Sequence, residues 1–469
     1  MVRYGLTHPD RLSVGDESTL RQAFALARLS LEADAPARRA LEEFRRLALA
    51  SAHALFGEGG TAPEPRPELF SAAASRLWGL ALAARDGTGD PKAWEAELRH
   101  RRLVLALGGG GGVGYVYLGC FALLDQWGLA PALIAGTSFG AVLGLFRAQR
   151  AAFHAQDTAE TLAGLSLQKL FRLFRVRSQY ALPGPLQLYL RSALLPALET
   201  LARKEAAGST DGAPSPAGGE VSFAPKLSDL PIPLVVAVAG LRKGMLPRPP
   251  KEYERLLDPR SFFPPTAGRL RGRVQDLFSV LGEFVRQPHR LDALIIGSDP
   301  GTQRFDALDA IGFSCSLPGF IHYDVVRDDP LAHRHIRRLF EERELGWLAD
   351  GGLVENCPAR AARLGFRAGA RGAPRNGFVL ALDAFSPKLS TAPWIGLERL
   401  AQETTRRVLP YADCYLPFPR TLSPLSLLPN REQIARAASF GRTELSPLMP
   451  FLARMLTPLP ALEACRPAV

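Results

Sequence analysis

The chain has 469 residues, of which 47% are hydrophobic and 22% charged, and this is the composition of a globular protein with a large core. Its 43 Gly and 39 Pro are too few for a low-complexity or collagen-like chain, so general disorder is excluded. The 57 Lys and Arg against 46 Asp and Glu give a net charge of +11, carried mostly by Arg, which favours phosphate-bearing partners or an anionic membrane surface.

The five cysteines form no CxxC pair and stand at Cys120, Cys315, Cys357, Cys414 and Cys465. An odd, scattered set argues against a disulfide framework and against a zinc site, and it favours a reducing compartment. Residues 1–17 lack the apolar segment of a signal peptide, and no apolar run is long enough to cross a bilayer. We therefore expect a cytoplasmic protein, peripheral at most to the inner face of a membrane.

Apolar residues recur at helical spacing from Ser18 to about Arg101, which predicts a helical N-terminal region over residues 1–101. Segments rich in Gly and Pro at 57–67 and 86–91 predict loops between these helices.

From Leu103 the pattern changes to short, purely apolar runs, which are typical of strands covered on both faces. The first βαβ unit combines a strand at 103–107, a helix at 117–127 and a strand at 133–135. Further strands are predicted at 234–239, 293–296 and 378–382, whereas 151–201 has a helical pattern.

Two segments stand apart from this α/β pattern. Residues 204–225 are small, polar and rich in Gly, Pro and Ser, which predicts a mobile insertion. Residues 387–469 form a Pro-rich, partly helical C-terminal extension without a strong motif.

Two glycine-containing turns follow predicted strands. In the loop 108–114, the residues Gly109, Gly110 and Gly111 can present backbone N–H groups to a phosphate or an oxyanion. The second turn is GTSFG at 136–140, where a GxSxG sequence between strand and helix is typical of a nucleophile elbow that exposes Ser138. Gly136 and Gly140 would relieve the crowding of that sharp turn.

A third candidate segment is informative only in combination with these two turns. It is Asp350-Gly351-Gly352, which by itself is typical of a plain turn. Combined with Ser138 it offers a carboxylate base for a serine nucleophile.

Two competing interpretations fail on the residues. Gly109, Gly111 and Gly114 satisfy the GxGxxG of a dinucleotide-binding loop, but the acidic residue expected about 20 positions later is absent, because that place reads ALIA. An α/β-hydrolase triad needs a histidine after the acid, and no histidine follows Asp350. His322, His333 and His335 remain alternative bases, although a histidine in an Arg-rich segment is more often a surface residue.

The combination of motifs resembles the patatin-like phospholipase family, in which a GGGxxG loop, GTSxG and a distant DGG follow in this order. The family loop falls on 109–114, the block 311–323 (IGFSCSLPGFIHY) resembles the family's Pro-Gly block, and 350–358 (DGGLVENCP) resembles its DGG-x-x-x-N-x-P block. The resemblance covers residues 102–386 as the catalytic domain. One departure is Val113, where the family usually has Arg or Lys.

The resemblance implies a three-layer α/β/α fold with a mostly parallel sheet, and a lipid acyl hydrolase with a Ser138/Asp350 dyad. Gly109, Gly110 and Gly111 would form the oxyanion hole, with Gly114, Gly136, Gly140, Gly351 and Gly352 supporting the motifs. It implies a phospholipid or other lipid ester as substrate, and no metal or organic cofactor. Because such a substrate lies in an interface, the net charge of +11 and the amphipathic helices before Arg101 lead us to expect peripheral contact with anionic membranes, and we expect no nucleic-acid partner. The alternatives are a catalytically silent lipid-binding or scaffold protein on the same fold and, least favoured, a nucleotide-binding oxidoreductase.

Overall fold

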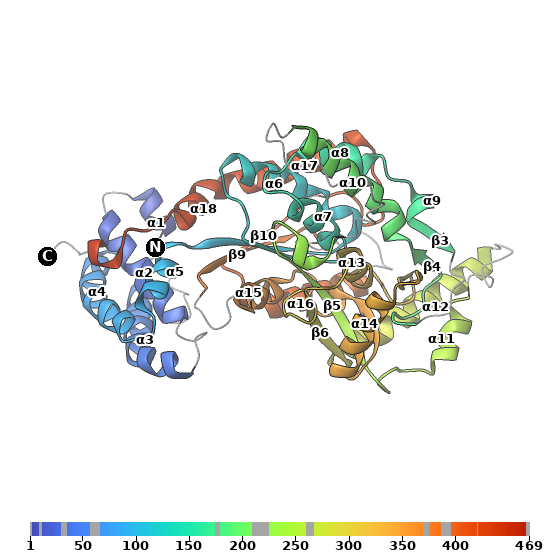
Figure 1. Ribbon diagram of the computed structural model, residues 1–469, viewed down its shortest axis with the longest axis horizontal. Coiled ribbons are helices and arrows are strands. Elements are labelled where there is room, and N and C mark those ends of the chain that lie inside the picture. The colour runs from blue at the N-terminus through green and yellow to red at the C-terminus, as the bar shows by residue number, and fades with distance from the viewer. Residues whose placement is uncertain are drawn as a thin grey trace. The chain divides into compact units, whose positions relative to one another are not determined.

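The computed structural model (Figure 1) describes most of the chain. The described residues are 2–8, 12–29, 35–56, 66–173, 179–208, 225–258, 267–368, 375–385, 395–419 and 421–465. Residues 209–224 of the predicted insertion and 57–65 of the first predicted loop lie outside this part.

Contacts divide the chain into two compact units, each assembled from separate stretches of sequence. The first contains Met1–Leu103, Phe366–Phe378 and Pro447–Val469, and the second contains Val104–Gly365 and Val379–Ser446. These divisions differ from the boundaries drawn from the sequence at 101/102 and 386/387, because residues 366–378 of the predicted catalytic domain belong to the first unit and the C-terminal stretch is divided between the two.

The first unit is helical, as the apolar periodicity predicts. Its helices are α1 (Val2–Thr7), α2 (Val14–Leu29), α3 (Ala35–Phe56), α4 (Phe70–Asp86), α5 (Pro91–Arg99) and α18 (Met449–Leu456). The predicted loop at 86–91 separates α4 from α5, and Asp90 caps α5 by accepting a hydrogen bond from the Ala93 N–H. Apolar side chains of α2 to α5 and Leu462 pack into one buried cluster, which stabilises this unit.

The second unit is built on a mixed, mostly parallel sheet, which confirms the predicted fold class. Seven strands of the described residues form it in the order β10-β9-β1-β2-β5-β6, and β8 pairs antiparallel with β5. They are β1 (Arg102–Leu107), β2 (Leu133–Thr137), β5 (Leu234–Arg242), β6 (Leu291–Ile296), β8 (Leu345–Asp350), β9 (Gly377–Asp383) and β10 (Cys414–Pro417). The predicted strands at 103–107, 133–135, 234–239, 293–296 and 378–382 are all present.

Helices cover both faces of this sheet, with α6 and α17 on one face and α15 and α16 on the other (Figure 1). The helices after β1 are α6 (Val116–Gln126), α7 (Phe139–Ala148), α8 (Ala155–Ala163), α9 (Leu167–Leu170), α10 (Leu190–Gly208), α11 (Pro250–Leu256), α12 (Ala267–Arg286), α13 (Ala307–Ser314), α14 (Pro330–Glu342), α15 (Ala359–Ala368), α16 (Ile395–Val408) and α17 (Arg431–Leu445). No described helix has both the length and the hydropathy needed to cross a membrane.

The helical prediction for 151–201 is wrong in part. This stretch contains two short strands, β3 (Phe171–Leu173) and β4 (Leu186–Leu188), which pair with β7 (Ile321–His322) in a second small sheet. Strands of three residues are too short to show an alternating pattern, and their pairing with a distant segment decides their conformation.

The helices α6 and α17 approach each other at two glycines. A Cβ on Gly119 would overlap the carbonyl of Ala438, and one on Gly441 would overlap the carbonyl of Val116. Helix α17 therefore packs against α6, the helix that follows the glycine loop.

Two strands meet end to end along β5 and define the position of the site. Thr137, the last residue of β2, pairs with Ala237, whereas Asp350, the last residue of β8, pairs with the next residue, Val238. Because β2 runs parallel to β5 and β8 runs antiparallel to it, their carboxyl ends converge. The fold thus brings together Ser138 and Asp350, which are far apart in the sequence.

Candidate functional site

Ser138 lies in the sharp turn between β2 and α7. Its backbone has φ 51° and ψ −126°, and Ser138 and Glu344 are the described non-glycine residues with positive φ. This conformation is costly for a residue with a Cβ and is found where the surrounding structure enforces it. Ser138 precedes the first turn of α7, so its side chain lies at the positive end of that helix dipole.

Asp350 at the end of β8 faces this serine. The Ser138 hydroxyl donates a hydrogen bond to Asp350 Oδ2 over 3.0 Å, and the Gly352 N–H donates to Oδ1 over 2.7 Å. One carboxylate oxygen is therefore held by the turn that follows it, while the other contacts the serine hydroxyl.

Burial changes the acidity of this carboxyl group. Desolvation raises the pKa of Asp350 to about 6, against the smaller opposite effect of the hydrogen bonds from Gly352 and Ser138. The carboxylate is therefore a stronger base than an exposed aspartate while still being mostly ionised at neutral pH.

Glycines make this close approach possible. A Cβ on Gly136 would meet the backbone nitrogen of Ala141 at 2.7 Å, and one on Gly140 would overlap the carbonyls of Leu107 and Gly108. A Cβ on Gly351 would likewise overlap the carbonyl of Ala237. These motif glycines are needed because main-chain atoms of neighbouring elements occupy the space of a side chain.

Two serines that the sequence motifs did not single out hold the pair in place. The Ser138 N–H donates to Ser314 Oγ over 2.8 Å, and Ser314 Oγ donates to the carbonyl of Ala237 over 2.6 Å. The Asp350 N–H donates to the carbonyl of Ser316 over 2.8 Å. Both serines belong to the predicted Pro-Gly block, so the block is recognisable from sequence although these hydrogen bonds are not.

The glycine loop lies beside the serine, and its N–H groups are used differently. The Gly109 N–H donates to the carbonyl of Asn356 over 3.0 Å, and a Cβ on Gly109 would lie 3.2 Å from Ser138 Cβ. Gly110 and Gly111 have φ of 128° and 63°, and among the described residues no acceptor is found for their N–H groups. Within the described residues, the N–H groups of Gly110 and Gly111 are therefore without an acceptor, and both glycines line the same cavity as Ser138.

The glycine loop is hydrogen-bonded to the segment before α17, which lies outside the predicted catalytic domain. The Gly112 N–H donates to the carbonyl of Pro424 over 3.0 Å, and the Tyr115 hydroxyl donates to the carbonyl of Leu427 over 2.8 Å. Val113, at the position where Arg or Lys was expected, is buried beside Gly110, and Gly114 lies against the ring of Phe139.

A cavity of about 480 Å³ opens at the pair. Ser138, Asp350, Gly110 and Gly111 form its polar end, and the rest of its described lining is almost entirely apolar. About half of the lining comes from α8 to α10, from β3 and β4, and from the segment before α17. Asp350 is the only carboxylate among these residues, and a cavity of this size and character suits an apolar ligand with one polar group.

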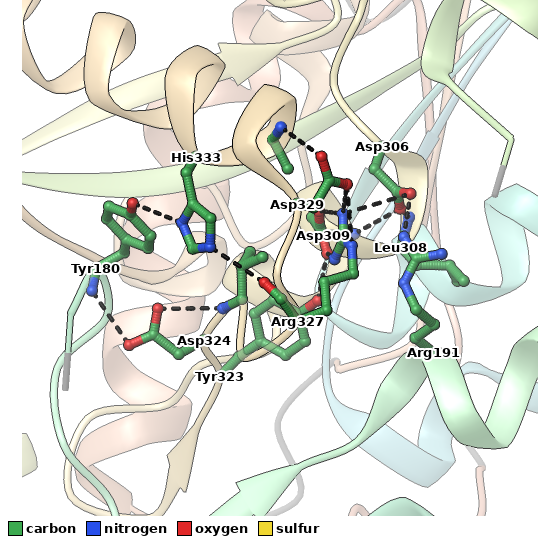
Figure 2. A network of polar contacts seen from close by, with 12 residues as sticks. Tyr180, Arg191, Asp306, Leu308, Asp309, Tyr323, Asp324, Arg327, Asp329 and His333 are labelled. Atoms are coloured by element: carbon green, nitrogen blue, oxygen red, sulfur yellow. Dashed lines mark hydrogen bonds and ion pairs between the residues drawn. The ribbon is translucent and has the colours of Figure 1, made fainter. Parts of the chain in front are cut away.

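The three histidines considered as bases lie in other environments. His322 Nδ1 contacts the carbonyl of Leu182 at 3.0 Å, and burial lowers the pKa of His322 to about 4. His333 shares a 2.8 Å hydrogen bond with the Tyr180 hydroxyl in the polar network that Figure 2 shows. The ring of His335 stacks on Phe305 at 6.2 Å. These contacts direct each ring to groups other than Ser138.

The structure also bears on metal and nucleotide ligands. In the part of the chain that the structure describes, no three His, Cys, Asp or Glu side chains cluster to hold a metal ion. At the end of β2, where a dinucleotide fold would offer an acid to a ribose, the chain has Thr137 and Ser138.

Comparison with known proteins places these motifs in one family. The family model described as patatin-like phospholipase matches residues 105–363, which is more than half of the chain. The match includes the glycine loop, Ser138 and Asp350. A search of curated proteins found no match.

Proposed function

Because the chain belongs to the patatin-like phospholipase family, we propose that it hydrolyses an acyl ester of a phospholipid or another lipid, using Ser138 as nucleophile and Asp350 as base. The observation that carries this proposal is the 3.0 Å hydrogen bond from the Ser138 hydroxyl to Asp350 at the polar end of an apolar cavity.

In the proposed reaction, Asp350 accepts the hydroxyl proton as Ser138 Oγ attacks the ester carbonyl. The alcohol leaves with a proton returned by Asp350, and the acyl group stays on Ser138. Asp350 then takes a proton from water, which attacks the acyl carbonyl, and returns that proton to Ser138 Oγ as the fatty acid leaves. The raised pKa of Asp350 supports both directions of this proton transfer.

We assign the oxyanion to the N–H groups of Gly110 and Gly111, because the Gly109 N–H already donates to Asn356. Gly109 instead gives the close packing against Ser138 that keeps the loop near the reacting carbonyl. The first turn of α7 adds its dipole to the same side of the site.

The proposal is tested by ester turnover together with covalent labelling. The wild type should hydrolyse soluble and vesicle-bound esters and react with a fluorophosphonate, whereas Ser138→Ala should do neither. A correctly folded wild type that binds lipid without turnover or labelling would favour the catalytically silent alternative.

The pH dependence of turnover follows from the burial of Asp350. A base with a pKa of about 6 is ionised above that pH, so kcat/KM for a soluble ester should be level above pH 7 and fall about tenfold per unit below pH 6. A pH–rate profile measures this. A profile still level at pH 5 would contradict Asp350 as the base.

The same burial predicts an effect on stability. The pKa of Asp350 is raised above the ordinary 3.8 in the folded state, so folding is favoured by the protonated form below about pH 4, and this contribution is lost as the pH rises through 6. Asp350→Asn should therefore be more stable than the wild type at pH 8 by about 1–3 kcal/mol, and the difference should shrink toward pH 4. Urea unfolding at the two pH values checks this, and an equal difference at both would contradict it.

A further inference from the structure

Three of the residues that line the cavity are leucines with exposed side chains. They come from α9, β4 and the segment before α17, and they are Leu167, Leu186 and Leu425, exposed by 56%, 40% and 68%. Single exposed leucines are common on protein surfaces, but these three border the same apolar cavity as Ser138. We call these three residues the leucine rim.

The chain segments that carry the rim have a one-sided charge. Residues 164–173, 179–194 and 421–431 contain Lys169, Arg172, Arg191 and Arg431 and no acidic residue. Arg191 pairs with Asp306 and Arg431 lies 3.8 Å from Glu160. Lys169 is exposed beside Leu167, and the Arg172 guanidinium lies 4.7 Å from the ring of Tyr189. Arg191 and Arg431 therefore face acidic partners from other elements, and the positive charge beside the rim rests on Lys169 and Arg172.

The N-terminal helices offer no comparable group of exposed apolar side chains around a cavity in the described residues. Most of the apolar side chains of α2 to α5 pack into their own buried cluster, and Val14, Leu49 and Leu80 are exposed singly. Apolar area, positive charge and access to Ser138 coincide at the rim.

We propose that the leucine rim is the surface by which this protein docks on a lipid bilayer that carries anionic head groups. The leucines insert among the acyl chains at the interface, and Lys169 and Arg172 meet the lipid phosphates. An acyl chain can then pass from the bilayer into the cavity without crossing water. The purpose of this docking rests on the proposed function, whereas the binding itself does not require turnover.

The test is vesicle sedimentation of full-length protein carrying Ser138→Ala, so that the lipid is not consumed. The vesicles are phosphatidylcholine alone or an equimolar mixture with phosphatidylglycerol. The triple variant Leu167→Ser, Leu186→Ser, Leu425→Ser should bind the anionic vesicles about 100-fold more weakly, since each half-inserted leucine contributes about fivefold. Lys169→Gln with Arg172→Gln should weaken binding about tenfold or more at low salt and less at high salt.

The matched control is Val14→Ser, Leu49→Ser, Leu80→Ser, whose residues are exposed by 73%, 43% and 37%. It should bind within about threefold of the parent, because its leucines and valine do not border the cavity. Thermal midpoints of all variants show whether each is folded. A second, folded rim variant, Leu425→Asp alone, keeps the test valid if the triple variant unfolds.

The proposal is overturned if the rim variants bind like the parent, if the control loses binding instead, or if neutral and anionic vesicles bind equally. It is also overturned if sedimentation velocity without vesicles shows a dimer that the rim variant dissociates, because a second copy would then cover the rim. Soluble-ester turnover by the wild type is measured separately: its absence would refute the proposed function, and the vesicle results would still decide the docking.

Discussion

Ser138→Ala and Asp350→Asn are each expected to lower kcat for an ester by about 10⁴-fold or more, and the double variant should be little worse than either. The reason is that the hydroxyl proton moves from Ser138 to Asp350 along the 3.0 Å hydrogen bond in the proposed reaction. Removing either the nucleophile or the base stops this transfer, so removing both adds little. Steady-state kinetics on a soluble ester, with fluorophosphonate labelling as a second readout, measures this.

His335→Ala is the control for that experiment. Its ring is partly exposed and stacks on Phe305, so its removal should leave kcat within about threefold. Additive losses in the double variant, or an active Asp350→Asn enzyme, would mean that another group accepts the proton.

Gly110→Ala is expected to cost about 2–4 kcal/mol of transition-state stabilisation, with the loss in kcat rather than in KM. At φ 128° a side chain is strained, and the new Cβ would come within 2.6 Å of the Phe385 ring and 2.7 Å of Val113. The loop must shift, and the N–H groups that we assign to the oxyanion would move with it. Kinetics together with the thermal midpoint separate this loss from general unfolding.

Replacing single amides by esters distinguishes the three glycines without adding a Cβ. An ester at position 110 or 111 removes an N–H that has no acceptor among the described residues, so it should lower kcat with little change in stability. An ester at 109 removes the hydrogen bond to Asn356 and should lower stability more than kcat. If instead the ester at 109 lowers kcat and those at 110 and 111 do not, the Gly109 N–H would be assigned to the oxyanion.

Much of the sheet could be predicted because its strands are short, apolar and buried on both faces. The runs at 103–107 and 234–239 are examples, since their composition alone is typical of the central strands β1 and β5. The turn at Ser138 was predictable for a local reason: a serine between two glycines after a strand leaves few other conformations.

The convergence of Ser138 and Asp350 was predictable only through the family resemblance. It depends on β8 running antiparallel to β5 while β2 runs parallel to it, and strand direction is decided by pairing between distant segments. For the same reason the sequence did not predict that the carbonyl of Asn356 accepts a hydrogen bond from the Gly109 N–H.

The place of β9 between β1 and β10 has a practical consequence for anyone who isolates the catalytic part of this protein. A fragment cut at the ends of the family match, residues 105–363, would lack β9 and the first three residues of β1, and what remains of β1 would become a sheet edge with open main-chain donors and acceptors. Such an apolar edge pairs readily with other chains, and the fragment would be recovered as aggregate. It would also lack the segment that holds Gly112 through Pro424. Expression should therefore extend at least through α17.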